Sequence, residues 1–205
     1  MVRRSFLKQI AIISSCLVMA ACAGAGKARS VSPSEQYNKR VEQLSIKDEL
    51  YSGWTNIFHY EATLITKDLY AQQVEFQSRA YQWSQEELIK SRRQMIESLG
   101  AETQIFISFF TPTIQYNDLN ESGSIWRVYL EVDGKRYQAS IQKNPASYPR
   151  LKSLYPGHSP WGKPYTAKFP IAFSQIEKAE KIRFVVTGNL GISEKQFTGF
   201  TSQNL

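Results

Sequence analysis

Cysteine and histidine are scarce in this chain, and their positions exclude several kinds of site. The 205 residues include two cysteines, Cys16 and Cys22, and two histidines, His59 and His158. Because both cysteines stand near the N-terminus, the rest of the chain has neither a disulfide nor a thiol for catalysis. The histidines are too far apart in the sequence to form the paired ligands of a zinc motif. We therefore predict no metal and no other cofactor.

Catalytic motifs are also missing. The sequence contains no glycine-rich phosphate loop, no Gly-x-Ser-x-Gly elbow and no His-Glu-x-x-His motif. We accordingly predict no catalytic residues and a protein that is not an enzyme. A Ser-His-Asp triad leaves no motif of its own, since its members meet only in the fold. A hydrolase that uses His158 and the adjacent Ser159 is therefore retained as an alternative.

A strong excess of charge is absent from most of the chain. The formal net charge is +7, but Arg3, Arg4 and Lys8 lie close to the N-terminus, so the remainder is only mildly basic. Elsewhere lysine and arginine alternate with acidic residues, as in 177–181, which is typical of solvated helix faces. Nucleic-acid binders concentrate their basic side chains on one face. We expect no nucleic-acid partner.

The N-terminal segment has the pattern of an export signal. A basic stretch, 1–8, precedes an apolar run, 10–19, which is shorter than the roughly 20 residues of a transmembrane helix. The run ends in Val18-Met19-Ala20-Ala21-Cys22, which resembles the lipobox of bacterial prolipoproteins. This resemblance implies a signal peptide over 1–21 that is cleaved before Cys22. It further implies a diacylglyceryl group on the Cys22 sulfur and an acyl chain, such as palmitate, on the new amine.

Lipidation at Cys22 predicts a membrane-anchored protein of the bacterial cell envelope. Each buried methylene contributes about 0.8 kcal/mol, so two or three acyl chains give lasting attachment. Ala23 follows the cysteine, and by resemblance to enterobacterial sorting this favours the outer membrane over the inner, facing the periplasm. One alternative is an ordinary signal peptide in which Cys22 is incidental. Another is a lipobox ending at Cys16, which has too short an apolar run before it.

The remaining sequence predicts a tether followed by a single globular domain. Residues 22–34 are rich in glycine, alanine and serine without apolar periodicity, so we predict a flexible tether there. Residues 35–205 suffice for one hydrophobic core but not for two domains. We predict a helical part over about 35–100 and a β-rich part over about 101–205.

Capping patterns predict three helices in the first part. Ser32-Pro33-Ser34-Glu35 has the pattern of a helix start with Ser32 as the cap. Thr66 can cap a second helix, and Ser84 with Glu87 forms the capping box of a third. Apolar residues recur at three-to-four spacing after both starts. The pattern predicts a helical hairpin over about 67–99.

The second part has strand periodicity, with side chains that alternate in twos. We predict an extended segment at 54–65, a helical turn at 174–181, and strands at 104–110, 125–132, 137–141, 165–169, 182–186 and about 195–200. Asp133-Gly134 predicts a two-residue hairpin turn. The predicted fold class is α+β, with N-terminal helices packed beside a mostly antiparallel, immunoglobulin-like β-sandwich of five or six strands.

The segment 144–165 is too long for a simple strand connection and is dense in proline and aromatic residues. One interpretation is structural: its aromatic residues cover one end of the core while its prolines stiffen the crossover. The other interpretation is functional, because aromatic and basic side chains on a loop suit a glycan or a protein partner. The candidate binding surface consists of Tyr148, Arg150, Lys152, Tyr155, His158 and Trp161.

Together these features predict a membrane-anchored lipoprotein that acts as a non-enzymatic binding or assembly module in the bacterial cell envelope. Its predicted partners are the membrane, through the lipid on Cys22, and an envelope protein or glycan. The main alternative is a cell-wall or polysaccharide binding module that uses the loop 144–165.

Overall fold

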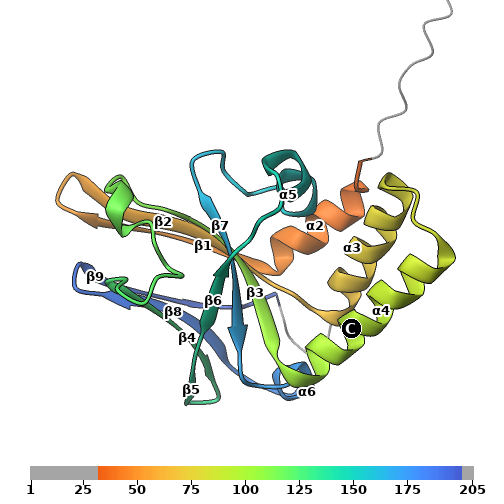
Figure 1. Cartoon of the computed structure of the whole chain (residues 1–205). Helices are drawn as coiled ribbons and strands as arrows, with labels where there is room; N and C mark the ends of the chain where they lie inside the picture. Colours follow the sequence, from red (N-terminus) through yellow and green to blue (C-terminus); the bar gives the residue numbers. More distant parts are fainter. Residues whose placement is uncertain (1–31, 200–205) are drawn as a thin grey trace, which may run out of the picture. The chain divides into compact units, whose positions relative to one another are not determined.

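The described part of the chain places its helices and strands in two β-sheets and a helical layer (Figure 1). The computed structural model describes residues 32–199; the predicted signal peptide, Cys22 and most of the predicted tether lie outside them, as does residue 200 of the last predicted strand. In chain order the elements are α2 (Glu35–Gln43), β1 (Ser45–Ser52), β2 (Thr55–Leu64), α3 (Lys67–Ala80), α4 (Gln85–Ala101), β3 (Thr103–Phe110), the 3₁₀ helix η2 (Ile114–Tyr116), β4 (Trp126–Val132), β5 (Lys135–Gln138), β6 (Ser140–Lys143), α5 (Tyr148–Leu154), β7 (Lys163–Phe169), α6 (Phe173–Ile176), β8 (Ile182–Gly188) and β9 (Gly191–Gln196).

Two antiparallel sheets enclose the main core. Their strand orders are β1-β2-β3-β7-β6 and β5-β4-β8-β9, and neighbouring strands pair antiparallel throughout. Trp126 of the second sheet contacts Phe58 and Phe109 of the first through edge-to-face rings, with centroid distances of 5.1 and 5.9 Å. Aromatic pairs in this geometry add about 0.5–1.5 kcal/mol to the free energy of area burial. The α+β class with two facing antiparallel sheets is confirmed.

The predicted number of five or six strands is wrong, because residues 32–199 contain nine. The predicted strand 137–141 divides at Ala139: β5 before it pairs with β4, and β6 after it pairs with β7 of the other sheet. The sequence pattern also fails to predict β1, an edge strand in which half-buried Ile46 and Leu50 alternate with charged residues. The last strand, β9, begins at Gly191 and ends at Gln196, earlier than predicted.

Helix starts follow the local capping chemistry. Thr66 accepts a hydrogen bond from the backbone N–H of Leu69, and Ser84 with Glu87 forms a reciprocal capping box. The first helix is capped by Ser34, whose Oγ accepts from the N–H of Tyr37 at 3.1 Å, so the predicted cap at Ser32 is wrong. A start at Glu35 turns Tyr37 and Val41 toward the interior, and the burial of these two residues decides the register.

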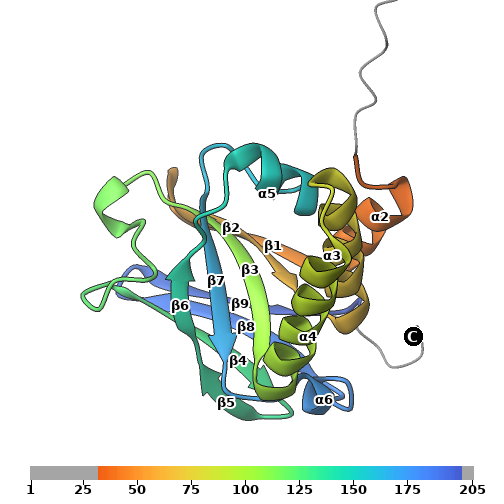
Figure 2. The ribbon, with the colours of Figure 1, turned by 45° about the vertical axis from the view of Figure 1, so that its right-hand side comes forward.

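A second, smaller core lies on the outer face of the five-stranded sheet. The helices α2, α3 and α4 lie together beside this sheet, and α5 lies near α2 and α3 (Figures 1 and 2). Apolar side chains from α2, α3 and α5 meet the outward-facing Phe106 of β3 in one buried cluster. On the same strand, Ile105, Ile107 and Phe109 belong to the inter-sheet core. Because β3 is covered on both faces, its apolar run is nearly continuous.

The helices of the described residues do not meet the requirements for crossing a membrane. Between residues 32 and 199, no helix has the length and apolar character that crossing a bilayer requires.

Candidate functional site

The loop 144–165 folds onto the outer face of the five-stranded sheet instead of projecting from it. Its middle forms α5, and Tyr155 stacks on Phe106 of β3 with ring centroids 3.7 Å apart and planes 3° from parallel. Tyr155 and His158 are 8 % and 2 % exposed, so they belong to the packed interior. Tyr148 and Trp161 are exposed, with Trp161 at 76 %. The six residues predicted as one surface are thus divided between the interior and the surface.

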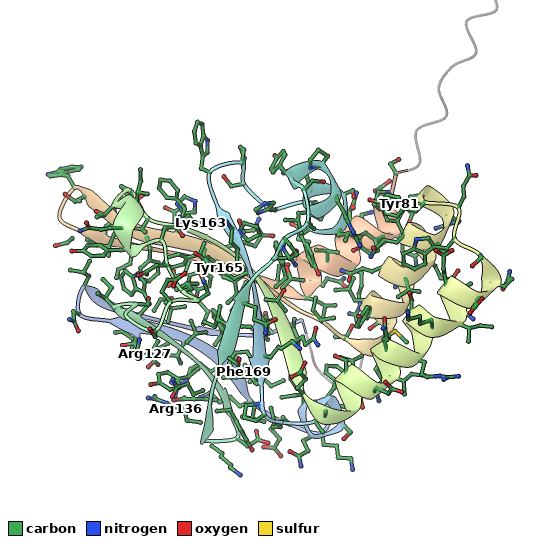
Figure 3. All side chains as sticks on the ribbon, viewed as in Figure 1. Tyr81, Arg127, Arg136, Lys163, Tyr165 and Phe169 are labelled. Atoms are coloured by element: carbon green, nitrogen blue, oxygen red, sulfur yellow. The ribbon has the colours of Figure 1, made fainter. Side chains whose placement is uncertain are left out.

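Two basic residues of the predicted surface have different roles. Lys152 donates from Nζ to the carbonyl oxygens of Pro156 and His158, the latter at 3.2 Å, so it closes the turn after α5. Arg150 instead reaches across to α3, where its guanidinium donates to Oε1 of Gln77. The same guanidinium lies 5.5 Å from the ring centre of Tyr81. Tyr81 directly follows α3, on the helical side of the structure (Figure 3). Arg150 therefore connects α5 to α3.

A cleft of about 380 Å³ lies beneath this connection, between α3, α5 and the outer face of β3 and β7. This volume falls near the lower end of the range of about 300–1,000 Å³ that is usual for ligand sites. Its lining consists of Ile65, Tyr70, Gln73, Gln77, Gln104, Phe106, Asn144, Pro145, Ala146, Arg150, Leu151, Leu154, Tyr155 and Thr166. The segment 144–165 therefore helps to form the cleft, because residues 144–146 and α5 belong to its walls.

Hydrogen bonds fix the wall of the cleft that α3 provides. Gln73 donates from Nε2 to the hydroxyl of Tyr37 at 3.2 Å, and that hydroxyl donates to the carbonyl of Leu154 at 2.7 Å. The chain of two bonds connects α3, α2 and α5. Gln73 and Gln77 are both buried, and they follow Leu69 at helical spacing on the inward face of α3. Two amides are therefore held in place at positions that normally carry apolar side chains.

The opposite wall is fixed in the same manner. Asn144 donates from Nδ2 to Oγ1 of Thr166 at 3.2 Å, while its Oδ1 accepts from the backbone N–H of Ala146 at 3.1 Å. On β3, Gln104 donates from Nε2 to a carboxylate oxygen of Glu102 at 3.0 Å. Ordered side-chain amides on both walls present donors and acceptors to the cleft without first having to reorganise.

Most polar side chains of the cleft are neutral amides, and one side chain is positively charged. Arg150 is the single lining residue with a full charge, and none of the lining residues carries a carboxylate. Burial raises the pKa of the Tyr155 hydroxyl to about 12 and also raises that of Tyr70, so both phenols stay protonated at neutral pH. Arg127 and Arg136 lie on the four-stranded sheet, away from Tyr81 and the helices (Figure 3). The cleft thus suits a polar ligand that is neutral or anionic.

None of the family models, curated proteins or solved structures compared with this chain matches it. Within residues 32–199, no group of three or more His, Cys, Asp or Glu side chains could hold a metal ion.

A serine and a histidine do meet in the fold, although not the pair considered from the sequence. Nδ1 of His158 lies 2.8 Å from Oγ of Ser108 on β3, whereas Ser159 accepts at Oγ from the N–H of Trp161 at 3.2 Å. Ser108 and His158 are both buried, so a substrate carbonyl has no approach to the serine oxygen. Within the described residues, no carboxylate hydrogen-bonds to His158 to orient it.

The pair has a clear structural use, which the glycines around it support. A side chain at Gly162 would overlap Oγ of Ser108, and one at Gly157 would overlap the carboxylate of Glu61. The loop backbone therefore lies directly against the sheet, and the His158 to Ser108 contact fixes it there. This contact holds the loop that forms one wall of the cleft.

Sequence reasoning found two lining residues, Arg150 and Tyr155, and missed the amides. A signal for the amides exists in the sequence, because Gln73 and Gln77 interrupt the apolar face of a helix that also carries Leu69 and Phe76. Polar residues at core positions of an amphipathic helix need partners, and here those partners belong to α2 and α5.

Proposed function

We propose that this chain is a bacterial lipoprotein precursor whose exported domain, anchored through a lipid on Cys22, is a non-enzymatic binding module of the cell envelope. The lipobox resemblance at residues 18–22 supports the anchor, with the outer membrane and a periplasmic orientation as the proposed location. For the architecture we propose a helical hairpin over about 67–99 beside an immunoglobulin-like sandwich, on the basis of consecutive α3 and α4 and two facing sheets.

The observation that carries the binding function is the cleft between α3, α5 and β3. It has ordered amides on two walls, an arginine at its edge and an apolar floor, which is the usual composition of a ligand site. Its lining has no serine or cysteine, and the hydroxyl of Thr166 accepts a hydrogen bond from Asn144 with no histidine or carboxylate in the lining to activate it. Binding without chemistry is the activity that these groups support.

Site-specific crosslinking tests this proposal, because residues 23–205 contain no cysteine. We suggest a photocrosslinker on a cysteine introduced by Ser147→Cys, at the exposed residue between the cleft wall and α5. Gln196→Cys, at an exposed position of β9 in the other sheet, is the matched control. The proposal predicts adducts in intact envelopes at position 147 and none at position 196. Equal labelling at the two positions, or none at either, would argue against a binding module centred on the cleft.

The cell-wall alternative has an observation of its own, the exposed Trp161 on the loop after α5. Exposed aromatic rings provide contact area for sugars at little entropic cost. Co-sedimentation of the chain with purified peptidoglycan distinguishes the two surfaces. Loss of retention after Trp161→Ala would assign the binding to the loop surface, whereas loss after Ala146→Trp, which fills the cleft, would assign it to the cleft.

A further inference from the structure

We propose that the cleft binds the free carboxylate end of a short peptide and that Arg150 pairs with that carboxylate. This inference rests on the proposed binding function and names the ligand class. It follows from three properties of the lining: its charge, the chemistry of its neutral polar groups, and the state of its aromatic rings.

Charge favours an anionic group on the ligand. Arg150 is the single charged residue in the lining, and the nearby carboxylate of Glu102 is paired with Lys168 at 2.7 Å. A guanidinium has five N–H donors in a planar fork that matches a carboxylate. Within residues 32–199, the hydrogen bond from Arg150 to Gln77 uses a donor of Nη2 alone. The other nitrogens keep their donors for a ligand.

The arginine is also held ready for such a ligand. The guanidinium of Arg150 is held by a hydrogen bond to Oε1 of Gln77 and by the ring of Tyr81, whose centre is 5.5 Å away. Gln77 is itself buried on the inward face of α3. A fixed guanidinium loses little side-chain entropy when a carboxylate docks, so the charge-assisted bond contributes more to affinity.

The neutral groups match peptide amides. Gln73, Gln77, Gln104 and Asn144 each carry one amide oxygen and two N–H donors, the same groups that a peptide backbone presents. They stand on walls formed by α3, β3 and the segment before α5. Part of each amide is used within the protein, since Oε1 of Gln77 accepts from Arg150 and Nε2 of Gln104 donates to Ser98 and Glu102. The Nε2 donors of Gln77 and the Oε1 acceptor of Gln104 are left to replace the hydrogen bonds that a peptide makes to water.

Two of the three aromatic rings in the lining disfavour a sugar at this site, and the third, Tyr70, is half-buried. Recognition of a sugar ring usually needs an accessible aromatic face. Phe106 and Tyr155 stack on each other at 3.7 Å and are both buried, so neither offers a free face to the cleft. They provide an apolar floor suited to small side chains. With about 380 Å³, the cleft has room for the last residues of a peptide and not for a long segment.

Calorimetric titration of the full-length chain tests the assignment. The probes are trialanine with a free C-terminus, trialanine amide, and N-acetyl trialanine with a free C-terminus. We expect binding of the two free acids and roughly tenfold or weaker binding of the amide. R150Q should reduce the affinity for the free acids to that for the amide. R79Q, at an exposed arginine of α3 outside the cleft lining, should leave it unchanged.

The outcomes separate this inference from the proposed function. Equal binding of acid and amide, or unchanged binding by R150Q with an unaltered melting temperature, overturns the role of Arg150. Absence of trialanine binding together with crosslinks at position 147 overturns the ligand class and leaves the binding module intact. Absence of both overturns the two proposals together. If R150Q lowers the melting temperature, R150K replaces it, since a lysine keeps the charge without the planar fork.

Discussion

Mild acid should destabilise this protein through His158. The imidazole is 2 % exposed, with Nδ1 at 2.8 Å from Oγ of Ser108 and with the rings of Phe106 and Tyr148 at 5.6 and 5.5 Å. Burial, and secondarily the positive charge of Lys152, lowers the pKa of His158 below its ordinary value of 6.5. The folded chain therefore keeps a neutral histidine at a pH where the unfolded chain is already protonated.

The sign of the effect follows from the proton count. Between the lowered folded pKa and the ordinary value near 6.5, the unfolded chain binds more protons than the folded one. The contribution of His158 to the free energy of unfolding is therefore fully present above this window. It is lost as the pH falls through the window. One histidine can change the free energy of unfolding by at most about 1.4 kcal/mol per pH unit. Between about pH 6.5 and 5 the loss is accordingly at most about 2 kcal/mol.

Carboxylates change the stability in a lower pH range than His158 does. Hydrogen bonds from two arginines lower the pKa of Glu131, and hydrogen bonds from Thr66 and Arg40 outweigh burial and lower that of Asp68. A lowered carboxyl pKa gives stability that is present above the ordinary value of about 4 and is lost below it. Measurements above about pH 5 therefore separate the histidine from these acids.

Urea denaturation at about pH 7.5 and pH 5 measures the difference in unfolding free energy. We expect the wild type and H59Q to lose stability on acidification, and H158Q to lose clearly less between the two pH values. H59Q is the matched control, because His59 is the other histidine and stacks on Phe110 on another part of the sheet. If H158Q loses as much as the wild type, the buried histidine is not the source and the reasoning is refuted.

Three further changes have expected outcomes. Cys22→Ser should remove the lipid mass in mass spectrometry and release the chain from the membrane fraction; an unmodified Cys22 in the wild type would contradict the anchor. Trp126→Ala should lower the unfolding free energy in urea by about 3–5 kcal/mol, since the buried indole contacts Phe58 and Phe109; a loss below about 1 kcal/mol would contradict this packing. Trp161→Ala should change the unfolding free energy by less than about 0.5 kcal/mol, because the side chain is exposed.

Local features of the fold were predictable because they depend on neighbouring residues. The caps at Thr66 and Ser84 need a side-chain oxygen and a backbone N–H three residues apart. The turn at Asp133-Gly134 needs two positive φ angles, and the structure has 47° and 85° there. Both interactions are complete within one helical turn or one hairpin, so the sequence contains all of their parts.

The strand count failed where pairing depends on distant segments. Tyr137 and Ile141, on either side of Ala139, both favour strands, and propensity alone does not reveal that the chain passes at Ala139 from one sheet to the other. The edge strand β1 is stabilised by β2 on one side and by contacts with β9 on the other, where Asp48 pairs with Lys195 at 3.1 Å and accepts from Ser193 at 2.6 Å. Its own sequence is too polar to suggest a strand.

For the candidate site, the sequence pointed to the loop and the structure decided its role. Arg150 was predicted as a surface cation, and the fold makes it a bridge to Gln77 at the edge of a cleft. His158 was predicted as part of the same surface, and the fold buries it against Ser108. Both differences come from the packing of the loop on distant segments, because Gln77 of α3 precedes Arg150 by 73 positions and Ser108 of β3 precedes His158 by 50.

The sequence by itself determined the helix starts after Thr66 and Ser84, the hairpin turn at Asp133-Gly134 and the scarcity of catalytic motifs, because each depends on residue type or on contacts within a few positions. Tertiary structure alone decided that Phe106 faces a second core, that glutamines of α3 meet an arginine of α5, and that together they wall a cleft. Those contacts join segments from four elements, and a buried amide or arginine is stable only where the fold brings it a partner.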